Sequence, residues 1–457
     1  MEQRVLALRF QWHNKEAVAI VTVLGAGKKT RAVIHARAYA ALLYCSLPVL
    51  LLVSTYLASQ HLSPNASVFG GENGFGATAQ SIVQQHRWGF VDKTYGLWCY
   101  ACRMPVIPVL QAASSRLSPK MATFLVLKTL LFWPLWAFAF FRLKSHYRIP
   151  DKWALVTVLL MLLTPYNLNI AGWVDVEEGF LFALIALAFS LLLTLEGTLS
   201  ALSLGLTLAA TYLTKSSMFP LCMVVSIWIV IRYWRNPRVV AIPILSIALA
   251  MFGWGIYVHA VSGVFAFGAD TSSWNGWNFY KGNNPWAYSL YPRVSLDTLD
   301  SEDRTHGLLP FVPIHSEWEL SHAQFALART YIREHPGSIL QMDLKKLFVA
   351  CCDVKESPEK TEGHTRIAIV LSNAVSHLTL ACVFLLVIAN VVRRQVSQAE
   401  ILAVLLTFAY LLPYFAGFLY MRHMVPIYGV MNLTLAVQLA RWHTPGPEMR
   451  GPENSLT

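Results

Sequence analysis

The sequence predicts an all-α polytopic membrane protein with about ten transmembrane helices. The 457-residue chain is 55% apolar and only 13% charged, whereas about a quarter of the residues in a soluble domain are charged. Its mean hydropathy is +0.47. Several uncharged apolar runs approach the roughly 20 residues that a membrane-spanning helix needs.

Residues 1–37 form a basic segment that we expect to lie along the cytoplasmic face of the membrane. Seven Lys and Arg residues surround the apolar run 17–24, which is too short to cross a bilayer. The basic region is also too long for a cleaved signal peptide. The segment is therefore interpreted as a cytoplasmic interfacial stretch.

Ten apolar segments follow this stretch. Residues 38–261 are expected to form a transmembrane core that includes the first external loop, 59–120. Residues 366–442 are expected to form the C-terminal helices, and the Pro- and Gly-rich tail 443–457 is predicted to be disordered. The predicted spans cover residues 38–58, 121–141, 153–163, 180–195, 199–213, 218–231, 239–261, 367–392, 401–418 and 424–440.

Charge predicts the orientation of these spans. The turns 142–152, 232–238 and 392–395 are dominated by Lys and Arg, and an even number of spans separates each of them from the N-terminus. They therefore share the cytoplasmic side under the positive-inside rule. Loop 262–365 carries 13 Asp and Glu against 9 Lys and Arg, and falls on the opposite side. The net charge of +11 is then explained by anionic lipid, with no nucleic-acid partner expected.

The two long extracytoplasmic loops are expected to contain helices. Residues 77–85 form a short amphipathic run in the first loop. Loop 262–365 is too long to lack structure in a compact protein and is predicted to form a domain. Its second part repeats apolar residues at helical spacing, interrupted at Pro336, which predicts two helices with a break at 335–337.

Two features of the first loop carry chemical groups. Glu72 is an acid set among glycines, which leave the backbone open to close approach by another molecule. The alternative is an ordinary loop carboxylate in water. Cys99 and Cys102 form C-x-x-C without the βαβ context of a redox enzyme, so we expect a local disulfide or two packed thiols there, and neither a disulfide framework nor a zinc site.

Four stretches carry a family resemblance. They are GENGFGATAQSIVQQHRWGF with RMPVIPVL after it, GLTLAATYLTKSSMFPL, WNFYKGNNPWA, and YMRHMVPIYGVMNLTLAVQLA. In their order and spacing they resemble the polytopic glycosyltransferases of the type C superfamily. The likeness is greatest to bacterial relatives of protein mannosyltransferases and aminoarabinose transferases that use polyprenyl-phosphate sugars. The chain departs from the family at Lys215, where Arg is usual, and at Glu72, where many members have Asp beside a second acid.

The resemblance implies an inverting transfer of a sugar from a polyprenyl-phosphate donor to a glycan, lipid or protein acceptor. It implies a multi-pass protein of the bacterial inner membrane, surrounded by membrane lipids, with its active site on the extracytoplasmic face. Glu72 would be the catalytic base. Basic residues would bind the donor phosphate, and acids, amides and an aromatic ring would bind the acceptor or sugar. The phosphate-binding candidates are Arg103, Lys215, Lys281 and Arg422, and the acceptor and sugar candidates are Asp175, Glu177, Glu178, Trp277, Asn278, Asn283 and Asn284.

Each candidate also has an ordinary structural explanation. The cations can anchor helices at the membrane interface, the acids can cap a helix start, and the asparagines can stabilise turns. One of the three acids, 175, 177 or 178, can alternatively bind a divalent ion, so metal dependence stays open. Lys128, within a span, is expected to snorkel toward the interface.

Two other functions compete with this one. A lipid or solute transporter or flippase would carry ionisable residues near mid-span and repeat symmetry, and mid-span charges are nearly absent here. An O-antigen ligase or polymerase also has a large outer loop but lacks an early acidic loop after the first span. The sequence therefore favours the glycosyltransferase.

Overall fold

The computed structural model describes residues 28–60, 62–63, 65–70, 74–92, 96–172, 177–292, 314–352 and 364–443. These residues are almost entirely helical, which confirms the predicted all-α class. Their one sheet pairs two very short antiparallel strands, β1 (Phe90–Val91) and β2 (Trp98–Cys99). The interfacial stretch and the tail predicted at the two ends of the chain lie mostly outside the described ranges.

Eight helices in the described ranges are long and apolar enough to cross a membrane. A ninth candidate joins α6 (Asp151–Leu162) to α7 (Pro165–Gly172) with a bend of 78°, and α8 (Glu178–Leu193) is apolar but shorter. All ten predicted spans are therefore helical. The eight are α2 (Lys28–Ser59), α5 (Met121–His146), α9 (Gly197–Thr214), α10 (Phe219–Tyr233) with the short η2 (Ser216–Met218) before it, α11 (Pro237–Ser262), α17 (His364–Val392), α18 (Gln398–Ala416) and α19 (Met421–His443).

Large apolar side chains face outward along the spans. Leu52 of α2 is 64% exposed, and Leu249 of α11 is 73% exposed. Exposed apolar surface on this scale would be unfavourable in water, whereas lipid chains cover it in a bilayer. The outer helices are therefore apolar toward lipid as well as toward the core.

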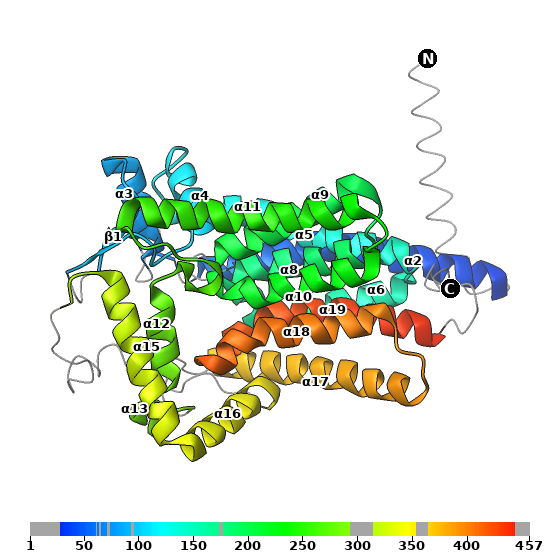
Figure 1. Ribbon diagram of the computed structural model, residues 1–457. Coiled ribbons are helices and arrows are strands. Elements are labelled where there is room, and N and C mark those ends of the chain that lie inside the picture. Colours follow the sequence, from blue (N-terminus) through cyan, green and yellow to red (C-terminus); the bar gives the residue numbers. More distant parts are fainter. Residues whose placement is uncertain are drawn as a thin grey trace.

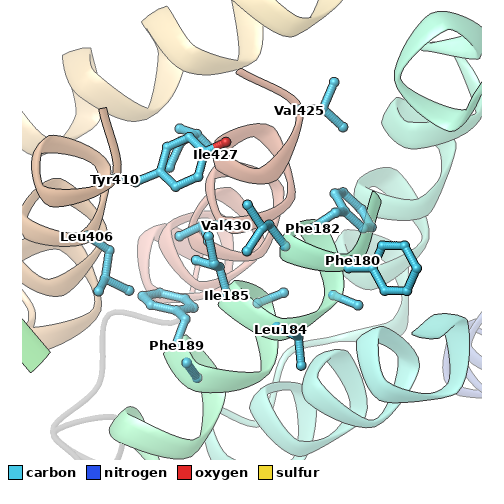
Figure 2. Close-up of a cluster of buried hydrophobic side chains, with 14 of the residues drawn as sticks. Phe180, Phe182, Leu184, Ile185, Phe189, Leu406, Tyr410, Val425, Ile427 and Val430 are labelled. Atoms are coloured by element: carbon cyan, nitrogen blue, oxygen red, sulfur yellow. The ribbon is translucent and has the colours of Figure 1, made fainter. Parts of the chain in front are cut away.

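Helix α8 forms the centre of the bundle. All of its residues are buried, as expected for a helix that is apolar on every side. It packs against α5, α9 and α19. Figure 2 shows part of the core that α8 makes with α18 and α19, with side chains that include Phe180, Phe182, Leu184, Ile185, Phe189, Leu406, Tyr410, Val425, Ile427 and Val430.

The two long loops lie at the same end of the bundle, and the α17–α18 turn lies at the other end (Figure 1). The predicted helix 77–85 is confirmed as α3, and the break at Pro336 is confirmed between α15 and α16. The first loop contributes α3 (Phe75–Gln85) and α4 (Val106–Ser115). Loop 262–365 contributes η3 (Gly268–Thr271), α12 (Trp274–Gly282), α13 (Pro285–Leu290), α15 (Glu317–Glu334) and α16 (Pro336–Cys351).

Candidate active site

Two of the predicted site residues, Glu72 and Asp175, lie outside the described residues. The next described residues after them are Gly74, the N-cap of α3, and Glu177, the N-cap of α8. The other candidates are described, and most of them lie where the two loops meet the bundle.

Glu177 and Glu178 stand at the start of α8 and both face Lys215. The Lys215 Nζ lies 3.6 Å from Glu177 Oε2 and 3.4 Å from Glu178 Oε1. Two carboxylates at a helix start are stabilised by the helix dipole. Lys215 can reach them because α9 ends at Thr214 and Lys215 itself is extended, with φ −153° and ψ 117°. The break in the second family-like stretch thus brings its cation to the start of α8.

Arg103 approaches the same carboxylates from the first loop. Its Nη1 lies 3.5 Å from Glu177 Oε1. The guanidinium is sandwiched between rings, with Cζ 3.8 Å from the centroid of Trp274 and 4.4 Å from that of Phe75. These cation–π contacts hold the planar group in one orientation while its edge faces the acids.

His423 contacts Glu178 from the start of α19. The backbone N–H of Tyr420 donates to His423 Nδ1 at 3.1 Å, so Nδ1 is the acceptor and Nε2 carries the hydrogen. That Nε2 lies 3.5 Å from Glu178 Oε1. Glu178 is buried, and its Oε2 has no hydrogen-bond partner among the described atoms.

The charges around Lys215 keep it protonated. Burial works to lower the pKa of this ammonium, but Glu177, Tyr414 and Glu178 outweigh burial and raise the pKa above its ordinary value. Arg422 acts on Lys215 in the opposite direction as a neighbouring like charge. Arg422 therefore belongs to the same electrostatic cluster, and its guanidinium lies 5.5 Å from the Tyr420 ring.

Lys128 is a further cation that sequence reasoning missed, and the expectation that it snorkels is wrong. Its side chain is only 2% exposed, and its Nζ lies 4.9 Å from the Phe180 ring centroid. The ammonium occupies the space that a Cβ on Gly179 would need. Gly179 directly follows Glu178 in the chain. A lysine inside an apolar span was the available signal, because a charge there is costly unless it faces the protein interior.

The stretch Gly282-Asn283-Asn284-Pro285 locks α12 to the end of α18. A Cβ on Gly282 would overlap the carbonyl oxygen of Gly417, so only glycine permits this backbone contact. The Asn283 Nδ2 donates to the Ala416 carbonyl at 2.7 Å, and Asn284 Oδ1 accepts from Ala287 N at 2.8 Å as the N-cap of α13. These amides therefore hold the chain that leads into α19.

Lys281 and Trp277 lie beside the ionic cluster. The Lys281 Nζ lies 5.4 Å from the Trp277 ring and 5.1 Å from the Phe418 ring. Phe418 in turn lies 5.7 Å from the His423 ring. Asn278, next to Trp277 on α12, brings its backbone carbonyl close to Gly417. The rings of Phe418 and His423 therefore lie between Lys281 and Glu178 at the start of α8.

The described residues contain one group with metal-ligand proximity, formed by Cys99, Cys102 and Glu317. The two cysteines are joined in a disulfide, which is the first of the two arrangements expected from the sequence. Their sulfurs are therefore not free thiolates. Glu177 and Glu178, which the sequence also offered as ligands of a divalent ion, face Arg103 and Lys215 instead.

Comparison with known proteins gives no family model and no curated protein that matches the chain. Among solved structures, ArnT from Cupriavidus metallidurans bound to undecaprenyl phosphate is 13% identical with a TM-score of 0.38, over 88% of this chain and 78% of that one. The same protein in the apo state is 14% identical with a TM-score of 0.38, over 89% and 78%.

A third structure is the Archaeoglobus fulgidus oligosaccharyltransferase in complex with Zn and sulfate. It is 12% identical with a TM-score of 0.40, over 86% of this chain and 49% of that one. At these TM-scores the likeness assigns neither an activity nor a ligand to this chain.

Proposed function

We propose that this chain is an inverting glycosyltransferase that moves a sugar from a polyprenyl-phosphate donor to an acceptor at the extracytoplasmic face of the membrane. One observation carries the proposal. Arg103 and Lys215, cations from widely separated stretches of the sequence, meet at the paired carboxylates Glu177 and Glu178, and the charge of Arg422 acts on the same group.

The cations suit the phosphate of the donor. The leaving group is a phosphate on a lipid chain, and it gains negative charge as the bond to the sugar breaks. Guanidinium and ammonium groups stabilise that charge best where water is excluded. Arg103 is 12% exposed and Lys215 is 19% exposed at their side chains, so both are largely shielded yet reachable. Lys128 adds a buried positive charge beside Gly179.

The carboxylates hold these cations close together and oriented in the absence of donor. Without Glu177 and Glu178, the positive charges of Arg103 and Lys215 would repel one another. Contacts at 3.4–3.6 Å are long for charge-assisted hydrogen bonds, which are usually about 2.7–2.9 Å. A phosphate oxygen can therefore compete for the same N–H groups without breaking an optimal pair.

Glu72 is the proposed general base. It takes the proton from the acceptor hydroxyl or amine while that atom attacks the anomeric carbon and the lipid phosphate departs. Phe75, three residues further along, supports the Arg103 guanidinium, so the segment that follows Glu72 reaches the phosphate-binding cations. Trp277 and Asn278 are proposed to contact the sugar beside Lys281, and Asp175 to contact the acceptor.

The proposal is tested by incubating the purified chain with a panel of polyprenyl-phosphate sugars and following release of the lipid phosphate. We expect turnover with at least one donor. Glu72→Gln should lower turnover by at least about 100-fold, because a positioned base contributes roughly 10²- to 10⁴-fold. Glu72→Asp keeps the carboxylate with a shorter reach and should retain part of the activity.

The controls separate the base from the function. If Glu72→Gln turns over normally, the base lies among the remaining acids, Asp92, Asp175, Glu177 or Glu178. A different result would be that the wild-type chain releases no lipid phosphate from any donor but moves polyprenyl-phosphate sugar across the membrane of proteoliposomes. That result would replace the proposed transferase function with a flippase function.

A further inference from the structure

A buried carboxylate joins the first loop to the loop domain. Glu317 Oε1 accepts from the backbone N–H groups of Tyr100 at 3.0 Å and Ala101 at 3.2 Å. Its Oε2 accepts from Ser273 Oγ at 2.6 Å. The Cys99–Cys102 disulfide closes the turn that presents the two N–H groups. We call residues 99–102, Ser273 and Glu317 the clasp.

Glu317 depends on all of these donors. The residue is 5% exposed, and a buried carboxylate is unfavourable unless its oxygens are hydrogen-bonded. Burial raises the pKa of Glu317, while the hydrogen bonds from Ser273, Ala101 and Tyr100 oppose that rise. Further bonds tie the same segments together, since Ser273 N donates to Ala101 O and Ser272 Oγ donates to Cys102 O. The clasp thus joins three segments of the chain.

The residues that follow the clasp form the seat of Arg103. Arg103 itself comes directly after Cys102, and Trp274, whose ring lies 3.8 Å from the guanidinium, comes directly after Ser273. A shift of the 99–102 turn would move the cation, and a shift of Ser273 would move its stacking partner. The distance of 3.5 Å from Arg103 to Glu177 therefore depends on the clasp being closed.

We propose that the clasp is redox-sensitive and positions Arg103 for the donor phosphate, an inference that rests on the proposed function. An extracytoplasmic dithiol oxidoreductase, or a small dithiol in its place, breaks the Cys99–Cys102 bond. Each sulfur gains one electron and one proton, and the reductant's two thiols become a disulfide. The four-residue turn then loses its cross-link, and the Tyr100 and Ala101 N–H groups are no longer held toward Glu317. Cys99, Cys102 and Glu317 are positioning residues in this reaction.

The test measures affinity and loop structure on the full-length chain in detergent. Binding of undecaprenyl phosphate is titrated with oxidised protein and with protein reduced by dithiothreitol. Hydrogen exchange of the peptide covering residues 98–103 is measured in both states. We expect reduction to weaken binding about tenfold, since a short cross-link restricts the loop by a comparable factor, and to accelerate exchange. Cys99→Ser/Cys102→Ser should bind like reduced wild type and ignore the reductant.

Matched variants separate the clasp from general damage. Cys351 and Cys352 are exposed and lie outside the clasp, so Cys351→Ser/Cys352→Ser should keep both wild-type affinity and its response to reductant. Glu317→Gln should weaken binding and accelerate exchange even when the disulfide is intact, and Glu317→Asp should recover part of both.

Each outcome decides the proposal. If oxidised wild type binds the lipid phosphate and reduction changes neither binding nor exchange, the clasp is not redox-sensitive. If exchange accelerates while affinity stays constant, the clasp does not position Arg103. If oxidised wild type does not bind the lipid phosphate at all, the proposed function fails and the positioning role fails with it.

Discussion

Two buried glutamates, one near the start of α8 and one near the start of α18, have opposite surroundings. Glu400 of α18 is fully buried, and both of its oxygens are satisfied. Oε1 accepts from Asn390 Nδ2 at 2.6 Å and Gln438 Nε2 at 2.9 Å. Oε2 accepts from the backbone N–H of Ser397 at 2.7 Å and from its hydroxyl at 2.8 Å, within a capping box. Arg441 lies 3.5 Å away.

Glu178 is equally buried, but short hydrogen bonds are lacking. Its Oε1 faces Lys215 and His423 at 3.4 and 3.5 Å, and its Oε2 has no partner among the described atoms. Buried polar atoms in folded proteins are nearly always paired. The difference teaches that Glu400 serves the fold, whereas the looser contacts of Glu178 agree with the proposed role of the surrounding cations in binding the donor phosphate.

Lys215→Gln should have the largest effect on activity among the variants that test this contrast between Glu178 and Glu400. Removing the central cation should lower kcat/KM for lipid-phosphate release about 100-fold, because a charged contact to the leaving group is lost. The unfolding temperature should change little. Lys215→Arg restores the charge and supplies the residue usual in the glycosyltransferases that the motifs resemble, and should recover most of the activity. A loss of stability as large as the loss of activity would instead make Lys215 part of the fold.

The converse variant is Glu400→Gln. It removes the charge that accepts hydrogen bonds from Asn390, Gln438, Ser397 and Arg441 and should cost about 1–3 kcal/mol of stability, seen as a lower midpoint in thermal unfolding. The folded fraction should keep wild-type kcat/KM. A variant that unfolds normally but loses turnover would break the contrast, because Glu400 would then also serve function.

The sequence predicted the fold more completely than the site. Apolar length and the basic turns predicted the helices, since these patterns reflect burial and lipid contact directly. The motifs also predicted Arg103 and Lys215, which do meet at the start of α8. The apolar span around Lys128 signalled that its charge faces the protein interior, but its contact with Gly179 could not be predicted, because it depends on how α5 packs on α8. Nor could the role of Glu317, because its backbone partners Tyr100 and Ala101 lie more than 200 residues earlier in the chain.

Gly179→Ala tests Lys128 with a smaller expected effect. A methyl group at this position would overlap both the Lys128 Nζ and the Ala171 carbonyl oxygen, so both would have to shift. We expect undecaprenyl phosphate to bind about tenfold more weakly, as for one displaced charged contact, and Lys128→Met, which removes the ammonium without touching Ala171, should weaken binding equally. Gly253→Ala in α11 is the matched control, because its Cβ would meet nothing within 4 Å. Equal affinities in the two glycine variants would remove Lys128 from the phosphate-binding group.

The smallest expected effect is the pH dependence of the clasp carboxylate. Burial raises the pKa of Glu317 above its ordinary value of 4.5, so the folded chain holds this proton more tightly than the unfolded chain. The stabilising contribution is complete below pH 4.5 and is lost as the pH rises through the raised pKa. Between these pH values the midpoint of thermal unfolding should fall, by about 2 °C for each 1 kcal/mol or so in a chain of this size.

Glu317→Gln should abolish this fall of the midpoint with pH, while Glu319→Gln, an exposed neighbour on the same helix, should keep it. If the unfolding midpoint of Glu317→Gln still falls with rising pH, another group titrates in this range. Glu317 would then differ from Glu178 only in having its hydrogen bonds satisfied.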